Sequence, residues 1–248
     1  MKLVNALAAP ALAACILISS SAPAATGHSP RWHEKFDFIR DIAPIVFHYD
    51  HGVLAGSYPP GRETTTVGFE DVSAFLGHVC LCGAGGFRIS RAALDELGAG
   101  EMPLEKGDFI LVTSKDNTVS DVVAFVLGCE RRSNLGKNRH FIDERIEAPR
   151  REYHYYIAYP PLERAVHVVY RKHLLTGNDM MDRLWKVETS FDADPASVGA
   201  DDMELYQATM VEMVREVLLG GREELISVES IEYEGFLARL DGLKTKAL

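Results

Sequence analysis

Apolar residues recur at every third or fourth position in several segments of this chain, which is the spacing of one face of an α-helix. Glycines follow several of these segments, where helices commonly end. The periodicity therefore predicts a set of amphipathic helices. They cover residues 31–43, 69–77, 87–97, 118–128 and 202–221. The fourth of them opens with Thr118 and Asp121 at the spacing of a capping box.

Other segments carry continuous or alternating apolar residues, which are the patterns typical of β-strands. The run DFILVTS at 108–114 indicates a buried strand. Two aromatic and β-branched runs within 152–170 are separated by Pro160 and Pro161, so this segment predicts an antiparallel hairpin. Alternation over 224–233 predicts a last strand. Helices interspersed with these strands predict an α+β fold, a single domain with a mixed or antiparallel sheet packed with helices.

The N-terminal 25 residues have the layout of a bacterial secretory signal. Lys2 is followed by an apolar run from Leu3 to Ile18, and small residues precede Ala25. Within this segment, LAAC ends at Cys15 and offers a minor alternative, in which acylation of Cys15 would anchor a lipoprotein. No second apolar segment is long enough to span a membrane. We therefore expect a periplasmic protein with no transmembrane segment in the mature chain.

Composition fits this interpretation and excludes some partners. The chain has 248 residues, of which 47% are hydrophobic and 25% are charged, as in ordinary soluble domains. Its net charge of −10 provides no global basic field for nucleic acid or anionic lipid. We divide the chain into a signal peptide at 1–25, an N-terminal helix and loop at 26–68, an α+β domain at 69–236 and a C-terminal tail at 237–248.

The most unusual local chemistry lies in the stretch GHVCLCGAGGFR. His78, Cys80 and Cys82 supply up to three metal ligands there, and Cys129 could add one from a distant part of the chain. Thiolate and imidazole are good zinc ligands, and a tetrahedral site needs three or four of them. Three cysteines follow the signal segment, and coordination explains an odd number in an oxidising compartment. We therefore expect these four residues to bind zinc or another transition metal.

Two other interpretations of the cysteines stay open. Cys80 and Cys82 could exchange a disulfide with each other or with Cys129, since a thiol near a helix N-terminus has a lowered pKa. A one-residue spacing would make that ring strained and reducible. Alternatively, a buried structural disulfide to Cys129 would leave one inert thiol.

The blocks FLGHVCLCGAGGFRISRAALDEL and SDVVAFVLGCERRSNLGK occur in this order, and REELISVESIEY follows them. Over residues 69–233 the chain thereby resembles the FmdE-type domain family, which takes its name from a component of formylmethanofuran dehydrogenase. The resemblance implies an α+β fold with a mixed sheet, often a homodimer, and a bound metal that is commonly zinc. It implies that His78, Cys80 and Cys129 occupy the family's metal-site positions.

The chain departs from that family's pattern in three places. Leu81 and Cys82 stand where the family usually has Pro-Gly, and Thr118 stands about where many members have a further cysteine. Glu130 follows Cys129 where a threonine is common. One cysteine is thus lost and another gained, which indicates either a rearranged site or a site that no longer binds the family's metal.

Several histidines outside these blocks are further candidates. The segment HYDH places His48, Asp50 and His51 together, as a second ligand group or as the donor of a fourth ligand. An exposed loop with polar side chains is the interpretation we favour for it. His154 and His167 fall on the predicted hairpin, where we expect partly buried histidines with hydrogen-bond partners.

These observations lead to a function hypothesis, a periplasmic metal-binding protein in metal handling or accessory to a metalloenzyme. A metalloenzyme with three protein ligands and an open coordination position is an alternative, with Glu130 as its general base. A thiol-disulfide protein is another. The partners expected are a metal ion and a second copy of the chain.

Overall fold

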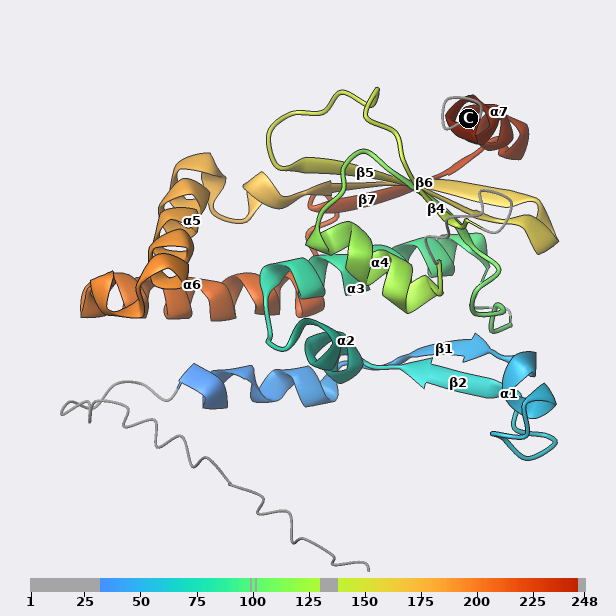
Figure 1. The fold of residues 1–248 in the computed structure, drawn as a ribbon, viewed down its shortest axis with the longest axis horizontal. Helices are drawn as coiled ribbons and strands as arrows, with labels where there is room; N and C mark the ends of the chain where they lie inside the picture. Colours follow the sequence, from blue (N-terminus) through green and yellow to red (C-terminus); the bar gives the residue numbers. More distant parts are fainter. Residues whose placement is uncertain (1–31, 99, 101, 130–137, 245–248) are drawn as a thin grey trace, which may run out of the picture. The chain divides into compact units, whose positions relative to one another are not determined.

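A mixed five-stranded sheet forms the centre of the described part of the chain (Figure 1). The computed structural model describes residues 32–98, 100, 102–129 and 138–244. The strands are β3 Ile110–Thr113, β4 His140–Ile142, β5 Glu152–Tyr159, β6 Arg164–Arg171 and β7 Ile226–Ile231. Their spatial order is β4-β3-β5-β6-β7, in which β3 is parallel to β4 and every other neighbouring pair is antiparallel.

Helices cover both faces of this sheet (Figure 1). Three of them pack on one face, namely α3 Leu81–Leu97, α4 Thr118–Leu127 and α6 Ala200–Leu219. Side chains alternate along β5, so Tyr155 and Ile157 belong to the main core beneath these helices. On the opposite face, Ala158 and Ala165 pack with Phe236 of α7, which spans Tyr233–Lys244. The predicted α+β class is confirmed.

The N-terminal segment contains more structure than its sequence predicts. The 3-10 helix η1 (Trp32–Asp41) replaces the α-helix that the periodicity predicts over 31–43. The predicted loop at 44–68 contains the antiparallel strands β1 (Ile45–His48) and β2 (Thr64–Val67), and the short helix α1 (Asp50–Leu54) lies between them. Burial of Ile45 and Phe47 explains this ordering, because these apolar residues alternate with more exposed ones. The helix α2 (Phe69–Leu76) lies at its predicted position.

Two α-helices beyond the β5–β6 hairpin differ from expectation. Helix α5 (Gly177–Ala193) has no counterpart among the predicted helices, and it precedes the loop that leads into α6. The predicted tail that begins at 237 belongs to α7 through Lys244, since Phe236 and Leu240 are buried against the sheet. Three short 3-10 helices complete the described elements, η3 Pro160–Leu162, η4 Lys172–Leu174 and η5 Pro195–Ser197.

The N-cap of helix α4 lies one residue before the predicted cap, Thr118, which is instead the first residue of the helix. Asn117 is the N-cap, and its side-chain oxygen accepts a hydrogen bond from the Ser120 backbone N–H at 3.0 Å. The Ser120 hydroxyl lies 3.1 Å from the Asn117 backbone N–H, so these two residues form the capping box in place of Thr118 and Asp121.

Two glycines allow α3 to pack closely on its neighbours. A Cβ at Gly86 would lie 2.6 Å from the Val122 Cβ of α4, and one at Gly85 would lie 2.7 Å from the Tyr170 ring of β6. Both distances are below van der Waals contact. Glycine at these positions therefore sets the distance between α3, α4 and the sheet.

The predicted signal peptide at 1–25, with Cys15, lies outside the described residues, as does Glu130. Among the described helices, none combines the length and the apolar character needed to cross a membrane.

Candidate metal and thiol sites

Cys80 and Cys82 lie at the N-terminal end of α3. Cys80 is the N-cap residue, and its Sγ accepts a hydrogen bond from the Gly83 backbone N–H at 3.4 Å. The backbone N–H groups at this end of a helix favour a negatively charged sulfur. Both thiols are free, and each shifts the pKa of the other. Cys80 therefore caps α3, Cys82 lies in its first turn, and the glycines that follow allow the helix to pack closely on its neighbours.

The two thiols differ in their affinity for a proton. The pKa of Cys82 is lowered, first because the Cys80 thiol donates a hydrogen bond to its sulfur and further because the Lys172 ammonium is nearby. Lys172 Nζ lies 4.0 Å from Cys82 Sγ. The pKa of Cys80 is raised, because this thiol keeps the shared proton and is largely buried. The pair therefore supports one thiolate, on Cys82.

A cavity of about 460 Å³ opens beside this pair and includes His78 in its lining. We call it the thiol cavity. Three methionines from α5 and α6 also line it, Met181, Met210 and Met213. The cavity therefore gathers sulfur ligands of two kinds, thiol and thioether, which are the ligands that soft transition metals prefer.

His78 is exposed, and its ring is already oriented. Its Nδ1 lies 3.1 Å from the Leu76 carbonyl oxygen, which can only accept a hydrogen bond, so Nδ1 carries the proton. Nε2 is then the nitrogen with a lone pair available for a metal. The ligand atoms of His78, Cys80 and Cys82 do not all lie within 4.8 Å of one another, since the one group of three among the described residues that does so lies elsewhere. Coordination by all three side chains would need a rotation of His78.

Cys129 is not brought together with the other three predicted ligands. It is 3% exposed, it follows the C-terminal end of α4, and its Sγ donates a hydrogen bond to the Phe109 carbonyl oxygen at 3.4 Å. Burial raises the pKa of its thiol to about 12. It lines a different cavity from Cys80 and Cys82. A single site formed by His78, Cys80, Cys82 and Cys129 is therefore not assembled in this structure.

Among the described residues, one group of three side chains has ligand atoms that all lie within 4.8 Å of one another: His48, Asp50 and Glu105. This group, the His48 cluster, could hold a metal ion. Backbone pairing assembles it, because the His48 N–H donates to Leu104 O and the Lys106 N–H donates to His48 O, both at 3.0 Å. The sequence pattern includes His48 and Asp50 but misses Glu105, which is 57 residues from His48 and has no local signal.

Three carboxylates surround the His48 imidazole, so this place in the structure favours a positive charge. His48 Nδ1 lies 3.0 Å from Glu105 Oε2 and 3.4 Å from Asp50 Oδ1, and Nε2 lies 3.6 Å from Glu63 Oε2. The hydrogen bond to Glu105 is the main reason that the pKa of His48 is raised, with Asp50 and Glu63 adding to it. The second Glu105 oxygen, Oε1, is buried and has no hydrogen-bond partner among the described residues.

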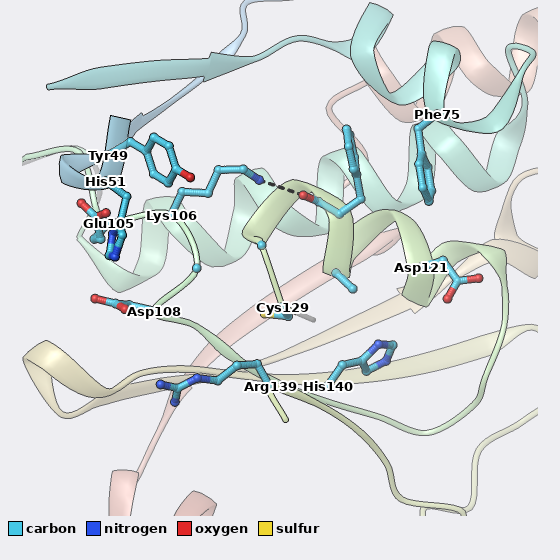
Figure 2. Close-up of a pocket in the computed structure, with 14 residues that line it drawn as sticks. Tyr49, His51, Phe75, Glu105, Lys106, Asp108, Asp121, Cys129, Arg139 and His140 are labelled. Carbon is cyan, nitrogen blue, oxygen red and sulfur yellow. Dashed lines mark hydrogen bonds between the residues drawn. The ribbon is translucent and has the colours of Figure 1, made fainter. Parts of the chain in front are cut away.

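Figure 2 shows the larger cavity, of about 920 Å³, which Glu105 and Cys129 both line. His51 lines this cavity and is not part of the His48 cluster. Lys106 extends along the wall (Figure 2). Its Nζ donates hydrogen bonds to the carbonyl oxygens of Phe125 and Val126, at 2.8 Å each. Lys106 thereby binds the last carbonyls of α4, which have no partner within the helix.

His154 and His167 have the partners expected of hairpin histidines. His154 Nδ1 lies 2.9 Å from His167 Nε2, and each ring also contacts a carboxylate. His154 contacts Glu152 at 3.2 Å, and His167 contacts Glu229 at 2.9 Å. These four side chains form a line of contacts across β5, β6 and β7, and the contacts link the three strands.

The fold and these side chains together define an α+β protein that has a candidate metal site. Comparisons of the chain with protein families, with curated proteins and with solved structures find no match. The resemblance to the FmdE-type domain family therefore stays a prediction from the sequence.

Proposed function

We propose that this protein binds a transition metal, zinc or another thiophilic ion, in the thiol cavity. The observation that carries the proposal is the pair of free thiols, Cys80 and Cys82, that line this cavity together with His78. Metals bind the thiolate form of cysteine, and the electrostatics favour a thiolate on Cys82. The Cys80 thiol loses its proton on coordination.

The other donors in the cavity fit this role. His78 holds its Nδ1 proton toward a carbonyl, so Nε2 can coordinate once the ring turns inward. The thioethers of Met181, Met210 and Met213 line the same cavity and extend the choice of ligands to softer ions. This donor set is suited to holding a metal, and we propose a role in metal handling or as an accessory to a metalloenzyme.

The cellular setting is part of the proposal. The secretory layout of residues 1–25 supports a periplasmic protein, in which coordination would protect the thiols from oxidation. The family resemblance supports a homodimer. Light scattering on the purified chain would give the oligomeric state directly.

The test is metal analysis of the full chain purified without a tag from the periplasm, with free thiols counted on the same sample. We expect about one metal ion per chain that depends on both thiols. C80S and C82S should each lose this ion. C129S is the matched control and should keep it, because Cys129 lines the other cavity.

Two results would contradict the proposal. One is a wild-type protein that carries no thiol-dependent metal while its thiols are oxidised. The other is a metal content that falls in C129S and is unchanged in C82S.

A thiol-disulfide protein is the second candidate, favoured by the contact between Lys172 and Cys82 beside a second thiol. In this reaction the Cys82 thiolate attacks a disulfide of a partner protein and releases one partner thiol. Cys80 then attacks the mixed disulfide, so that the partner leaves reduced and Cys80 and Cys82 are joined. Loss of exchange with a disulfide substrate in C82S, in protein that binds no metal, would favour this candidate.

A further inference from the structure

We propose that the His48 cluster binds a divalent first-row metal ion at a site separate from the thiol cavity. Its three side chains offer one imidazole nitrogen and carboxylate oxygens, a donor set that suits Mn²⁺ or Zn²⁺. None of the three lines the thiol cavity. This site is therefore independent of the proposed function.

The spacing of the donor atoms matches the size of such an ion. Metal–ligand distances of about 2.1 Å place neighbouring ligand atoms roughly 3.0–3.4 Å apart. His48 Nδ1 lies 3.0 Å from Glu105 Oε2 and 3.4 Å from Asp50 Oδ1. The backbone pairing of β1 with residues 104–106 holds His48 and Glu105 at this spacing.

Surrounding groups orient two of the ligands. Glu63 contacts the other ring nitrogen of His48, Nε2, at 3.6 Å. A carboxylate on the distal nitrogen of a ligating histidine directs the lone pair of the proximal nitrogen toward the metal and raises its basicity. The Glu105 backbone N–H donates to the Tyr159 hydroxyl at 3.1 Å, which fixes the chain at this ligand.

Glu105 provides a second, independent indication of a bound cation. Its side chain is only 18% exposed, and Oε1 is buried without a hydrogen-bond partner among the described residues. A buried carboxylate oxygen without a partner is costly, and a metal ion beside the carboxylate would offset that cost.

The cluster also has room for exchangeable ligands. Asp50 is 72% exposed, so the site is open to solvent on one side. Glu105 lines the large cavity that Figure 2 shows. Three protein ligands leave coordination positions for water, or for a ligand that enters from this cavity.

The experiment uses the full chain with both C80S and C82S, so that no thiol pair contributes to binding. Mn²⁺ is titrated and its free aquo-ion signal is followed by electron paramagnetic resonance. We expect one Mn²⁺ per chain. E105Q and D50N should weaken binding strongly, and E63Q should weaken it by about 10- to 100-fold, the usual effect of removing an orienting carboxylate.

Asp108 supplies the matched control, because it lines the same cavity without belonging to the cluster. D108N should bind Mn²⁺ as the parent does. The exposed position of Asp50 keeps D50N informative even if E105Q folds poorly. The proposal would be overturned if D50N bound Mn²⁺ as tightly as the parent. It would also be overturned if D108N lost as much Mn²⁺ affinity as E105Q, because the ion would then be attracted by the acidic surface as a whole and not by this cluster.

Discussion

Replacing Gly86 by alanine tests the close packing of α3 on α4. The new Cβ would lie 2.6 Å from both Cβ and Cγ1 of Val122, and 3.0 Å from the Val119 carbonyl oxygen. Carbon atoms pack at about 3.5–4.0 Å, so the helices would have to separate by about 1 Å. A rotamer change cannot relieve these contacts, because they involve a Cβ and a backbone atom.

Two opposing effects determine how much G86A changes the free energy of unfolding. Overpacking of this kind destabilises a core by about 1–3 kcal/mol, whereas glycine to alanine within a helix stabilises by up to about 1 kcal/mol. We therefore expect G86A to lower the free energy of unfolding by about 1–2 kcal/mol. For a chain of this length, that corresponds to a fall in Tm of about 2–8 °C.

The assay is urea unfolding and thermal melting, both followed by circular dichroism. G235A is the matched control, because it makes the same change within α7, where the atom nearest to a new Cβ is the Glu232 Cβ at 3.9 Å. It should be neutral or slightly stabilising. A G86A variant as stable as the wild type, or an equal loss of stability in G235A, would refute the packing argument.

Three further predictions concern stability and reactivity. D143N should lower stability at pH 7 by about 1–3 kcal/mol, because the Asp143 side chain is 1% exposed and pairs with Arg145 at 2.5 Å and with Arg239 of α7 at 2.9 Å. These pairs lower the pKa of Asp143. Its contribution to the free energy of unfolding is therefore present above about pH 4 and is lost as the pH falls through the lowered pKa. The stabilities of wild type and D143N should converge in acid unfolding curves. Cys129 should react with a thiol reagent only after unfolding, because it is buried and its pKa is raised to about 12; rapid labelling of the native chain at this position would contradict this. Lys106→Met should lower the free energy of unfolding by about 1–2 kcal/mol through the loss of two hydrogen bonds to α4, measured by urea unfolding, and an unchanged midpoint would contradict it.

The elements that the sequence predicts best are those whose burial has a regular period. Helices α2, α4 and α6 and the hairpin of β5 and β6 lie close to their predicted positions, because one face of each is buried against the core. The prolines and glycines of segment 44–68 predict a loop instead of the two strands found there. These strands are four residues each, too short for alternation to stand out.

The candidate sites show where a local pattern stops being informative. Cys80 and Cys82 can be recognised as a pair because they are neighbours in the sequence. Their distance from Cys129 depends on how α3 and α4 cross, which spacing does not reveal. Glu105 joins His48 through pairing between distant segments, and nothing in its immediate sequence distinguishes it from other acidic residues.

The positions of the three described cysteines have a consequence for their oxidation. Cys80 and Cys82 lie at the positive end of one helix dipole, whereas Cys129 lies at the negative end of another and is buried. Disulfide formation proceeds through thiolates, so an oxidant would react with the first two cysteines and not with the third. Once the chain is folded, the Cys129 thiol is therefore protected from forming a disulfide with another protein.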